Sequence, residues 1–454
     1  MNLTQIAYSG VRASSIGLSV TGQNSANVNT PGFTRLGAVQ RSVSGYGSLT
    51  GGGVEVSGIR RISDDFLNQQ LWRATTSENY YTTSQQYLTA MEGLMSSDGA
   101  SISTGLDNFF AALSEASATP DSHALRQQII AEAGNLAQRF NTLGSNLHTQ
   151  LQSLQEQRGS MVTEINGLTN NIALLNKKIV AAEAAGTDTS ALQDQRESLI
   201  GDLSKFASIR TNVTSDGSLS VSLANGQPLV ATTSAAQLSV TLNAAGEQEI
   251  GLSFAGTLFD LDQEGLGGSL GALYDTEYQA LRPNQEALGQ MAEQFSDMVN
   301  NTLAGGFDLA GNAPAQPLLV FTSGSSSNML SLGDVSASEL ALSDTAGETG
   351  NNGNLLKLLD LRNQTITVNG NVSTVNDAYA GLIGQLASVS RQNKADLSTA
   401  TTVTTQAQAQ RDSVSAVDLD EEAVNLLTYQ QAYQANMKVI STAKDLFDTM
   451  LAAF

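Results

Sequence analysis

The C-terminal stretch from Asp418 to Phe454 constrains the fold more than any other part of the chain, because it carries a heptad repeat almost to the last residue. The d positions of this repeat are all apolar: Leu419, Leu426, Tyr433, Ile440 and Phe447. The a positions include the polar Gln430 and Lys444, and polar residues at such positions fix the register of a coiled coil. No proline or glycine interrupts the stretch. The pattern predicts a long helix with a coiled-coil face that needs a partner, and the alternative is an ordinary amphipathic core helix.

Length and composition set the class of protein. The chain has 454 residues, of which 41% are hydrophobic, so it can bury sizeable cores in two to four domains. Its net charge of -21 argues against nucleic acid and anionic membrane as partners, since both select basic surfaces. We expect neither a cleaved Sec leader nor a membrane anchor, because no apolar run of suitable length and flanks is present. The absence of cysteine excludes disulfides, thiol catalysis and cysteine-ligated metals, and it suits a chain that is transported unfolded.

The N-terminal region, from Asn2 to about Asn27, predicts a helix that ends in a turn. Apolar side chains recur at helical spacing at Leu3, Ala7, Val11 and Leu18. Small residues at Gly10, Ala13 and Gly17 would permit close approach of another helix. The turn formers that follow are Asn29, Thr30, Pro31, Gly32 and Phe33.

Both chain ends resemble those of flagellar axial proteins. The N-terminal signature of that class is Asn-x-Ala-Asn-x-Asn-Thr-Pro-Gly-aromatic, and this chain carries it at Asn24, Ala26, Asn27, Asn29, Thr30, Pro31, Gly32 and Phe33. The matching C-terminal positions are Asn425, Leu426, Tyr429, Gln430, Ala432, Tyr433, Ala435, Asn436 and Phe447. Two positions depart from the pattern: Ser25 replaces the usual isoleucine, and Leu36 follows Arg35 where glutamine is common.

The middle of the chain predicts a mainly α fold with an inserted all-β domain. Helical periodicity dominates residues 64–206, with a break at Pro120, and returns near residue 269. Between these parts the period changes to two, with hairpin signals at Asp216-Gly217 and Asn225-Gly226. After a loop-rich stretch over 307–362, a further helix is predicted from about 374 to 413.

These patterns divide the chain into three domains. They are a terminal helical core domain (1–60 and 410–454), a helical bundle domain (61–206 and 266–409) and the inserted β domain (207–265). The two ends of the insert should lie close together, and we expect the insert to be the outermost and most exposed part.

Motifs in the helical region separate the families within the class. Those that resemble the hook-associated protein 1 family are Ile165, Asn166, Ile172, Ala173, Leu175, Asn176, Asp194, Gln195 and Arg196. The resemblance implies a secreted, extracellular structural component at the hook-filament junction of the bacterial flagellum, exported unfolded through the flagellar type III apparatus. It also implies a homo-oligomeric ring with three other partners: the flagellar hook protein, the third hook-associated protein and an export chaperone.

The terminal helices are the predicted assembly interface, because neither can bury its apolar face alone. The interface residues are Leu3, Ala7, Val11, Leu18 and the five d positions, with Gln430 and Lys444 setting register and residues 29–33 forming the turn.

The sequence offers no convincing catalytic or metal site. Ser269 lies in a formal G-x-S-x-G match, yet that motif in hydrolases requires a later histidine, and His123 and His148 both precede it. Neither histidine has a third ligand at zinc spacing. We therefore predict no enzyme activity, no cofactor and no metal. Three alternatives stay open: another axial protein such as the third hook-associated protein, a secreted adhesin that acts through the β insert, and a hydrolase that uses Ser269.

Overall fold

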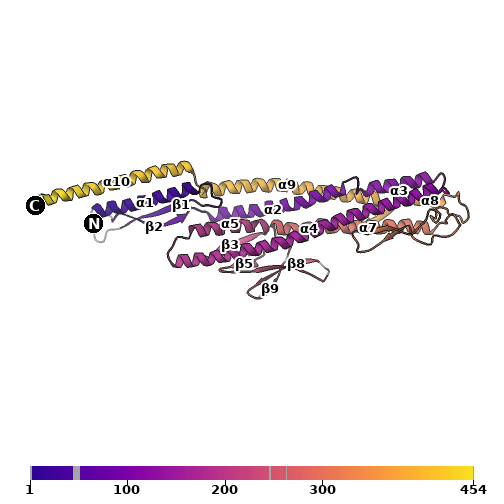
Figure 1. Ribbon diagram of the computed structural model, residues 1–454, viewed down its shortest axis with the longest axis horizontal. Coiled ribbons are helices and arrows are strands. Elements are labelled where there is room, and N and C mark those ends of the chain that lie inside the picture. Colours follow the sequence, from indigo (N-terminus) through magenta and orange to yellow (C-terminus); the bar gives the residue numbers. More distant parts are fainter. Residues whose placement is uncertain (1–2, 44–51, 245–246, 262, 453–454) are drawn as a thin grey trace.

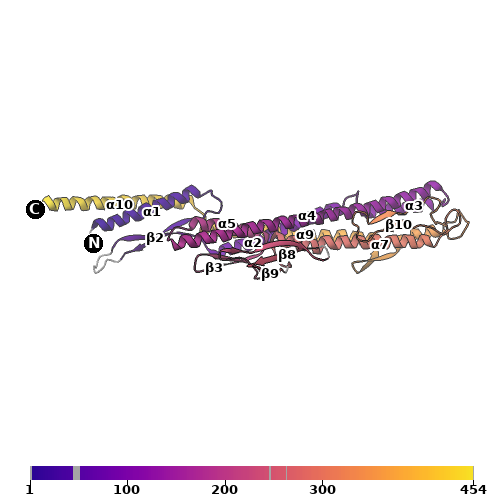
Figure 2. The same ribbon diagram turned by 60° about the horizontal axis from the view of Figure 1, so that its bottom comes forward.

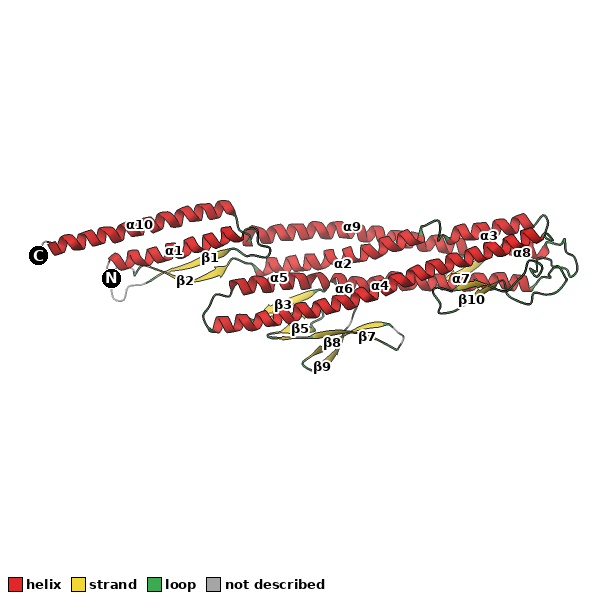
Figure 3. Ribbon diagram, viewed as in Figure 1, coloured by secondary structure: helices red, strands yellow, loops and turns green. Residues whose placement is uncertain are grey.

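The computed structural model is a long rod with both chain ends at the same end (Figure 1). It describes residues 3–43, 52–244, 247–261 and 263–452. The rod has two main parts, a terminal unit and a helical bundle that carries a β insert on one flank (Figure 3). The mainly α fold with an inserted β region confirms the predicted fold class.

The terminal unit consists of two helices and a hairpin: α1 (Leu3–Asn27), β1 (Leu36–Ser42), β2 (Val54–Arg61) and α10 (Leu419–Ala452). α1 packs against α10 on one side and against the antiparallel β1–β2 hairpin on another. The glycine-rich sequence of residues 45–58 predicts an extended segment with a turn. β2 agrees with that over its described part, and residues 44–51 lie outside the described residues.

Helices of the bundle run along the rod axis. They are α2 (Asp65–Met95), α3 (Ile102–Ala116), α4 (His123–Ala184), α5 (Ser190–Phe206), α6 (Gly268–Thr276), α7 (Arg282–Ala304), α8 (Gly353–Asp360) and α9 (Val375–Ser415). α2 packs along α9 and α6, while α4 packs on α3 and α5. A π-helical turn, Glu277–Leu281, joins α6 to α7 and carries the fully buried Glu277, which pairs with the buried Arg158 of α4.

Two small hairpins lie between α7 and α9. They are β10 (Leu319–Phe321) with β11 (Leu330–Leu332), and β12 (Thr365–Val368) with β13 (Asn371–Thr374). The sequence did not predict them, because strands of three or four residues are too short to show a period.

The β insert forms two antiparallel sheets. One contains β3 (Ile209–Val213), β4 (Leu219–Leu223), β5 (Pro228–Ala231) and β6 (Ser234–Ala235). The other contains β7 (Gln237–Leu242), β8 (Gln248–Phe254) and β9 (Thr257–Asp260). Gly217 and Gly226 have positive φ in the turns on either side of β4, where hairpin signals were recognised. The chain enters and leaves the insert at one place, since Ser208 N donates to Leu266 O at 2.7 Å.

The insert shares its hydrophobic core with the bundle. Leu219, Val221 and Leu252 are buried in the same cluster as α4 residues such as Ile165. Two asparagines of α4 bind strand backbone through both amide atoms: Asn166 binds the N–H and carbonyl of Leu238, and Asn176 those of Leu219. The insert is therefore held to α4 along its length.

The turn between β3 and β4 contains a carboxylate with a perturbed pKa. The Asp216 carboxylate accepts hydrogen bonds from the hydroxyl groups of Thr214 and Ser218, both at 2.7 Å. The bond from Thr214, followed by those from Ser218, lowers the pKa of Asp216 to about 2.

Candidate assembly interface

α1 and α10 pair antiparallel in steps of seven residues. Gly10 lies opposite Asn436, and Gly17 lies opposite Tyr429. Seven residues further along α1, Asn24 donates to the carboxylate of Glu422 at 2.8 Å. The three pairs share one register, so the contact is a heptad seam built mainly from small and polar side chains.

The two glycines let the helices approach closely. A Cβ atom at Gly10 would lie 2.5 Å from Asn436 Oδ1, and one at Gly17 would lie 2.6 Å from the Tyr429 ring. Gly22, five residues further along α1, has open space around it. The requirement for glycine is therefore confined to the positions that face α10.

Asn24 connects three parts of the terminal unit. Besides the bond to Glu422, its amide pairs with the carbonyl and N–H of Leu36 in β1, at 3.0 and 2.9 Å. Asn24 is 1% exposed and Glu422 is 2% exposed. These hydrogen bonds fix α1, α10 and the hairpin relative to one another. In the sequence, Asn24 stands out only as part of the N-terminal motif. The signal that could have found its role is the shared seven-residue spacing of Gly10, Gly17 and Asn24.

The predicted interface residues lie at different depths in this arrangement. On α1, Ala7 is buried, Val11 and Leu18 are partly buried, and Leu3 is exposed. On α10, Tyr433 and Ile440 are partly buried, whereas Leu419, Leu426 and Phe447 are exposed. The face of α10 toward α1 precedes the predicted one by one residue, which is about 100° around the helix. It consists of Glu422, Asn425, Tyr429, Ala432, Asn436 and Ala443, together with Tyr433 and Ile440 at its edge.

Within the chain, Gln430 and Lys444 do not set the register. Both are exposed, and the contacts of Gly10, Gly17 and Asn24 determine the pairing of α1 with α10. A role for Gln430 and Lys444 toward neighbouring subunits stays a prediction.

The large apolar side chains of α10 are left uncovered by α1, some because they face away from it and others because α10 extends beyond the first described residue of α1. We call this set the α10 outward face: Leu419, Val424, Leu426, Leu427, Met437, Val439, Leu446, Phe447, Met450 and Leu451, all between 37% and 62% exposed. In contrast, the buried apolar side chains in the described part of the terminal unit before β2 are limited to Ala7, Ala13, Val20 and Leu36. An exposed apolar surface of this extent marks an interaction site.

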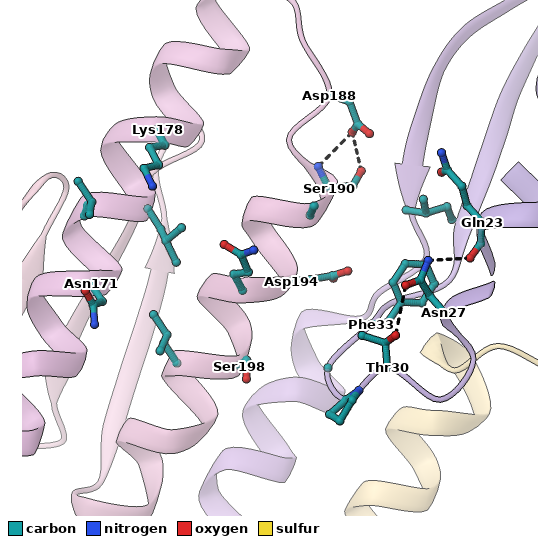
Figure 4. Close-up of a pocket in the computed structure, with 18 residues that line it drawn as sticks. Gln23, Asn27, Thr30, Phe33, Asn171, Lys178, Asp188, Ser190, Asp194 and Ser198 are labelled. Atoms are coloured by element: carbon teal, nitrogen blue, oxygen red, sulfur yellow. Dashed lines mark hydrogen bonds between the residues drawn. The ribbon is translucent and has the colours of Figure 1, made fainter. Parts of the chain in front are cut away.

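The turn after α1 lies across a groove from α4 and α5 (Figure 4). Thr30 N donates to Asn27 O at 2.8 Å and Phe33 N donates to Thr30 O at 3.2 Å. Gly32 has φ +77°, and its position is packed near Ser198 of α5. Asn29 and Pro31 are exposed, while Phe33 is partly buried. The groove has a volume of about 800 Å³ and separates the turn from Asn171 and Lys178 of α4.

The residues considered for catalysis do not come together. Ser269 is buried at the start of α6, where its Oγ accepts a hydrogen bond from Thr83. His123 and His148 are both exposed on α4 and lie roughly 37 Å apart along it at 1.5 Å per residue. Over the ranges that the structure describes, no group of three or more metal-ligating side chains could hold an ion. No described helix is long and apolar enough to cross a membrane.

Comparison with known proteins gives the class and then the family. The family described as flagellar basal body rod FlgEFG protein C-terminal matches residues 408–453. Together with the paired chain ends, this match defines a flagellar axial protein. The family described as flagellar hook-associated protein FlgK helical domain matches residues 88–319, just over half of the chain. The chain therefore belongs to the FlgK family, which confirms the resemblance found in the sequence.

Full-length relatives agree with this assignment. Flagellar hook-associated protein 1 of Salmonella typhimurium is 28% identical over 99% of each chain. The protein of the same name from Bacillus subtilis is 27% identical, covering 98% of this chain and 97% of its own. The structure of the flagellar hook junction protein FlgK from Burkholderia pseudomallei covers 75% of this chain and 99% of its own, with a TM-score of 0.68 and 19% identity. That likeness shows a common fold.

Proposed function

We propose that this chain is a structural component of the bacterial flagellum that self-assembles at the hook-filament junction and connects hook to filament. Family membership supports this role. The observation that carries the mechanism is the α10 outward face, because it lets one helix bind α1 and a neighbouring subunit at the same time. Its polar heptad seam pairs with α1 in the same subunit, and its apolar face stays free for neighbouring subunits.

The far end of α10 has the largest unpaired apolar surface. Ala443 lies near the first described residue of α1 in the observed register, and α10 continues to Ala452. Leu446, Phe447, Met450 and Leu451 lie on this extension and are each between 59% and 62% exposed. Covering one such half-exposed side chain is worth about 1–2 kcal/mol, so several together can hold subunits in a ring.

The finer parts of the proposal concern partners and domains. The ring of like subunits would contact the hook protein on one side and the third hook-associated protein on the other. A chaperone would cover the terminal helices before export, and the assembled protein would be extracellular. The terminal domain would comprise residues 1–60 and 410–454, the bundle 61–206 and 266–409, and the insert 207–265. The net charge of -21 would repel anionic partners, which supports the exclusion of nucleic acid and anionic membrane as partners.

Binding to isolated hooks tests the proposal. Purified wild-type protein should add to hooks and then support filament growth, as seen by electron microscopy. The variant Leu426→Asp with Phe447→Asp places two carboxylates on the α10 outward face and should lose binding while keeping the wild-type melting temperature. The matched control is Thr402→Asp with Gln406→Asp, at exposed positions of α9. Failure of the wild type to bind hooks, or normal binding by the α10 variant, would overturn the proposal.

A further inference from the structure

The joint between the terminal unit and the bundle is narrow. Both ribbon views show the terminal unit projecting from one end of the bundle (Figures 1 and 2). Among the described elements, no helix or strand of the terminal unit packs lengthwise against a bundle helix. Two grooves, of about 800 and about 490 Å³, flank the place where Gly32 meets Ser198. With so little packing, the angle between the two parts must be fixed by a small number of contacts.

One ion-pair cluster bridges this joint. Arg61, the last residue of β2, donates through Nε to Asp194 at 2.7 Å. Its Nη1 and Nη2 atoms bind the two carboxylate oxygens of Glu197 at 2.7 and 2.6 Å. Asp194 and Glu197 are three residues apart on α5, so one guanidinium group is held by a full turn of a bundle helix.

Neighbouring groups complete the cluster. Thr34 follows the turn after α1, and its N–H donates to the second oxygen of Asp194 at 3.2 Å. The Thr34 hydroxyl accepts from Arg61 Nη2 at 3.0 Å, and Asn68 of α2 donates to Glu197 at 3.3 Å. Nearly every donor and acceptor at the centre therefore has a partner, which is the condition under which a sheltered ion pair is favourable.

The cluster is sheltered from solvent. The side chains of Arg61, Asp194 and Glu197 are 7%, 12% and 16% exposed. Burial alone would lower the pKa of Arg61, but hydrogen bonds and charge from Glu197 and Asp194 outweigh it and raise the pKa. The surface pair of Arg41 and Glu55 within the hairpin is more than half exposed and has no comparable shelter.

We propose that Arg61 is a positioning residue which, through Asp194 and Glu197, sets the orientation of the terminal unit relative to the helical bundle. The planar guanidinium group binds both oxygens of the Glu197 carboxylate, so it fixes the relative orientation of the two groups as well as their distance. The single ammonium group of a lysine could not fix that orientation. The other bonds at the joint are few, such as Arg35 N to Ser415 O at 2.9 Å. This inference rests on the proposed function, because orientation matters where many terminal units must enter one ring in the same direction.

Distance measurement between spin labels tests the proposal in the full-length chain. Because the sequence has no cysteine, Thr428→Cys on α10 and Asn170→Cys on α4 give two exposed and unique label sites. The wild-type background should show one narrow distance distribution. Arg61→Gln should broaden or shift it, and Arg61→Lys should give an intermediate result because one carboxylate can still be bound.

Arg60→Gln is the matched control, since Arg60 is the adjacent residue of β2 and is exposed. It should leave the distribution narrow. If Arg61→Gln does not fold, as judged by circular dichroism, the double variant Asp194→Asn with Glu197→Gln tests the same joint from the other side. A distribution that is already broad in the wild-type background, or one that stays narrow in the folded Arg61 or α5 variants, would overturn the proposal.

Hook binding separates this inference from the function on which it rests. The labelled pairs measure orientation in free protein, so their result stands whether or not hooks are bound. If orientation matters for assembly, Arg61→Gln should bind hooks more weakly than Arg60→Gln. A wild type that fails to bind hooks would reject the function while leaving the orienting role of Arg61 intact.

Discussion

The substitution Gly17→Ala isolates the close approach of α1 and α10. An added Cβ would lie 2.6 Å from the Tyr429 ring, which is rigid and cannot yield as a long flexible side chain would. Overpacking of this kind costs about 1–3 kcal/mol. Gly22→Ala is the matched control, because Gly22 lies in the same helix with open space around it.

Comparison of the two variants cancels the effect of helix propensity. Each replacement of glycine by alanine within a helix gains about 0.5–1 kcal/mol. The difference between them therefore reports the clash, and 1–3 kcal/mol corresponds to roughly 5- to 150-fold in an opening equilibrium. Hydrogen exchange of the α1 and α10 amides should be faster by such a factor in Gly17→Ala than in Gly22→Ala, with the bundle amides unchanged.

Equal protection in the two variants would refute the reasoning, because it would mean that Gly17 does not lie against Tyr429. Gly10→Ala provides a weaker version of the same test. The atoms it would meet belong to the end of the Asn436 side chain, which can move away at lower cost.

Three further predictions concern other parts of the chain. Asn24→Ala should destabilise the terminal unit by about 3 kcal/mol or more, because it removes bonds to a buried carboxylate and to strand backbone. Gln23→Ala, at the adjacent exposed position of α1, should change the same hydrogen-exchange protection by at most about 0.5 kcal/mol. Deletion of residues 207–265 with a short linker should preserve hook binding but lower the melting temperature of the bundle in calorimetry, since it uncovers one face of α4; loss of hook binding by the folded deletion protein would contradict this. The folded pKa of Asp216 is lower than that of an ordinary aspartate, so its stabilisation of the β3–β4 turn is present above about pH 4 and is lost as the pH falls through about 2. The protection factors of the amides in this turn, taken relative to the intrinsic exchange rate at each pH, should fall over that range in the wild type and not in Asp216→Asn.

Local signals in the sequence predicted much of the fold. The hairpin signal Asp216-Gly217 depends only on residues within a few positions of the turn. Pro120 likewise lies in the break between α3 and α4, because proline disfavours the interior of a helix. The length of α10 could likewise be predicted from its uninterrupted repeat. Such features depend on interactions between near neighbours in the chain.

The side of α10 that packs against α1 could not be predicted in the same way. Hydrophobicity marks Leu426 and Phe447 most strongly, yet these side chains are exposed, while the partly buried Ala432 and Asn436 face α1. The deciding contacts are with glycines at the opposite end of the sequence, and a glycine gives no hydrophobic signal. The joint is similar, because Arg61 and Asp194 are separated by 133 positions and nothing local in either predicts their pairing.

Photo-crosslinking during assembly tests the central claim most directly. A benzophenone label on Leu446→Cys would sit on the exposed part of α10 that extends beyond α1, and one on Ala432→Cys would sit where α10 packs against α1. We expect position 446 to give crosslinks between copies once the protein has assembled on hooks, and few or none in dilute free protein. Position 432 should give mainly crosslinks within one chain. Assembly on hooks without crosslinks between copies from position 446 would contradict the claim that the outward face of α10 joins neighbouring subunits.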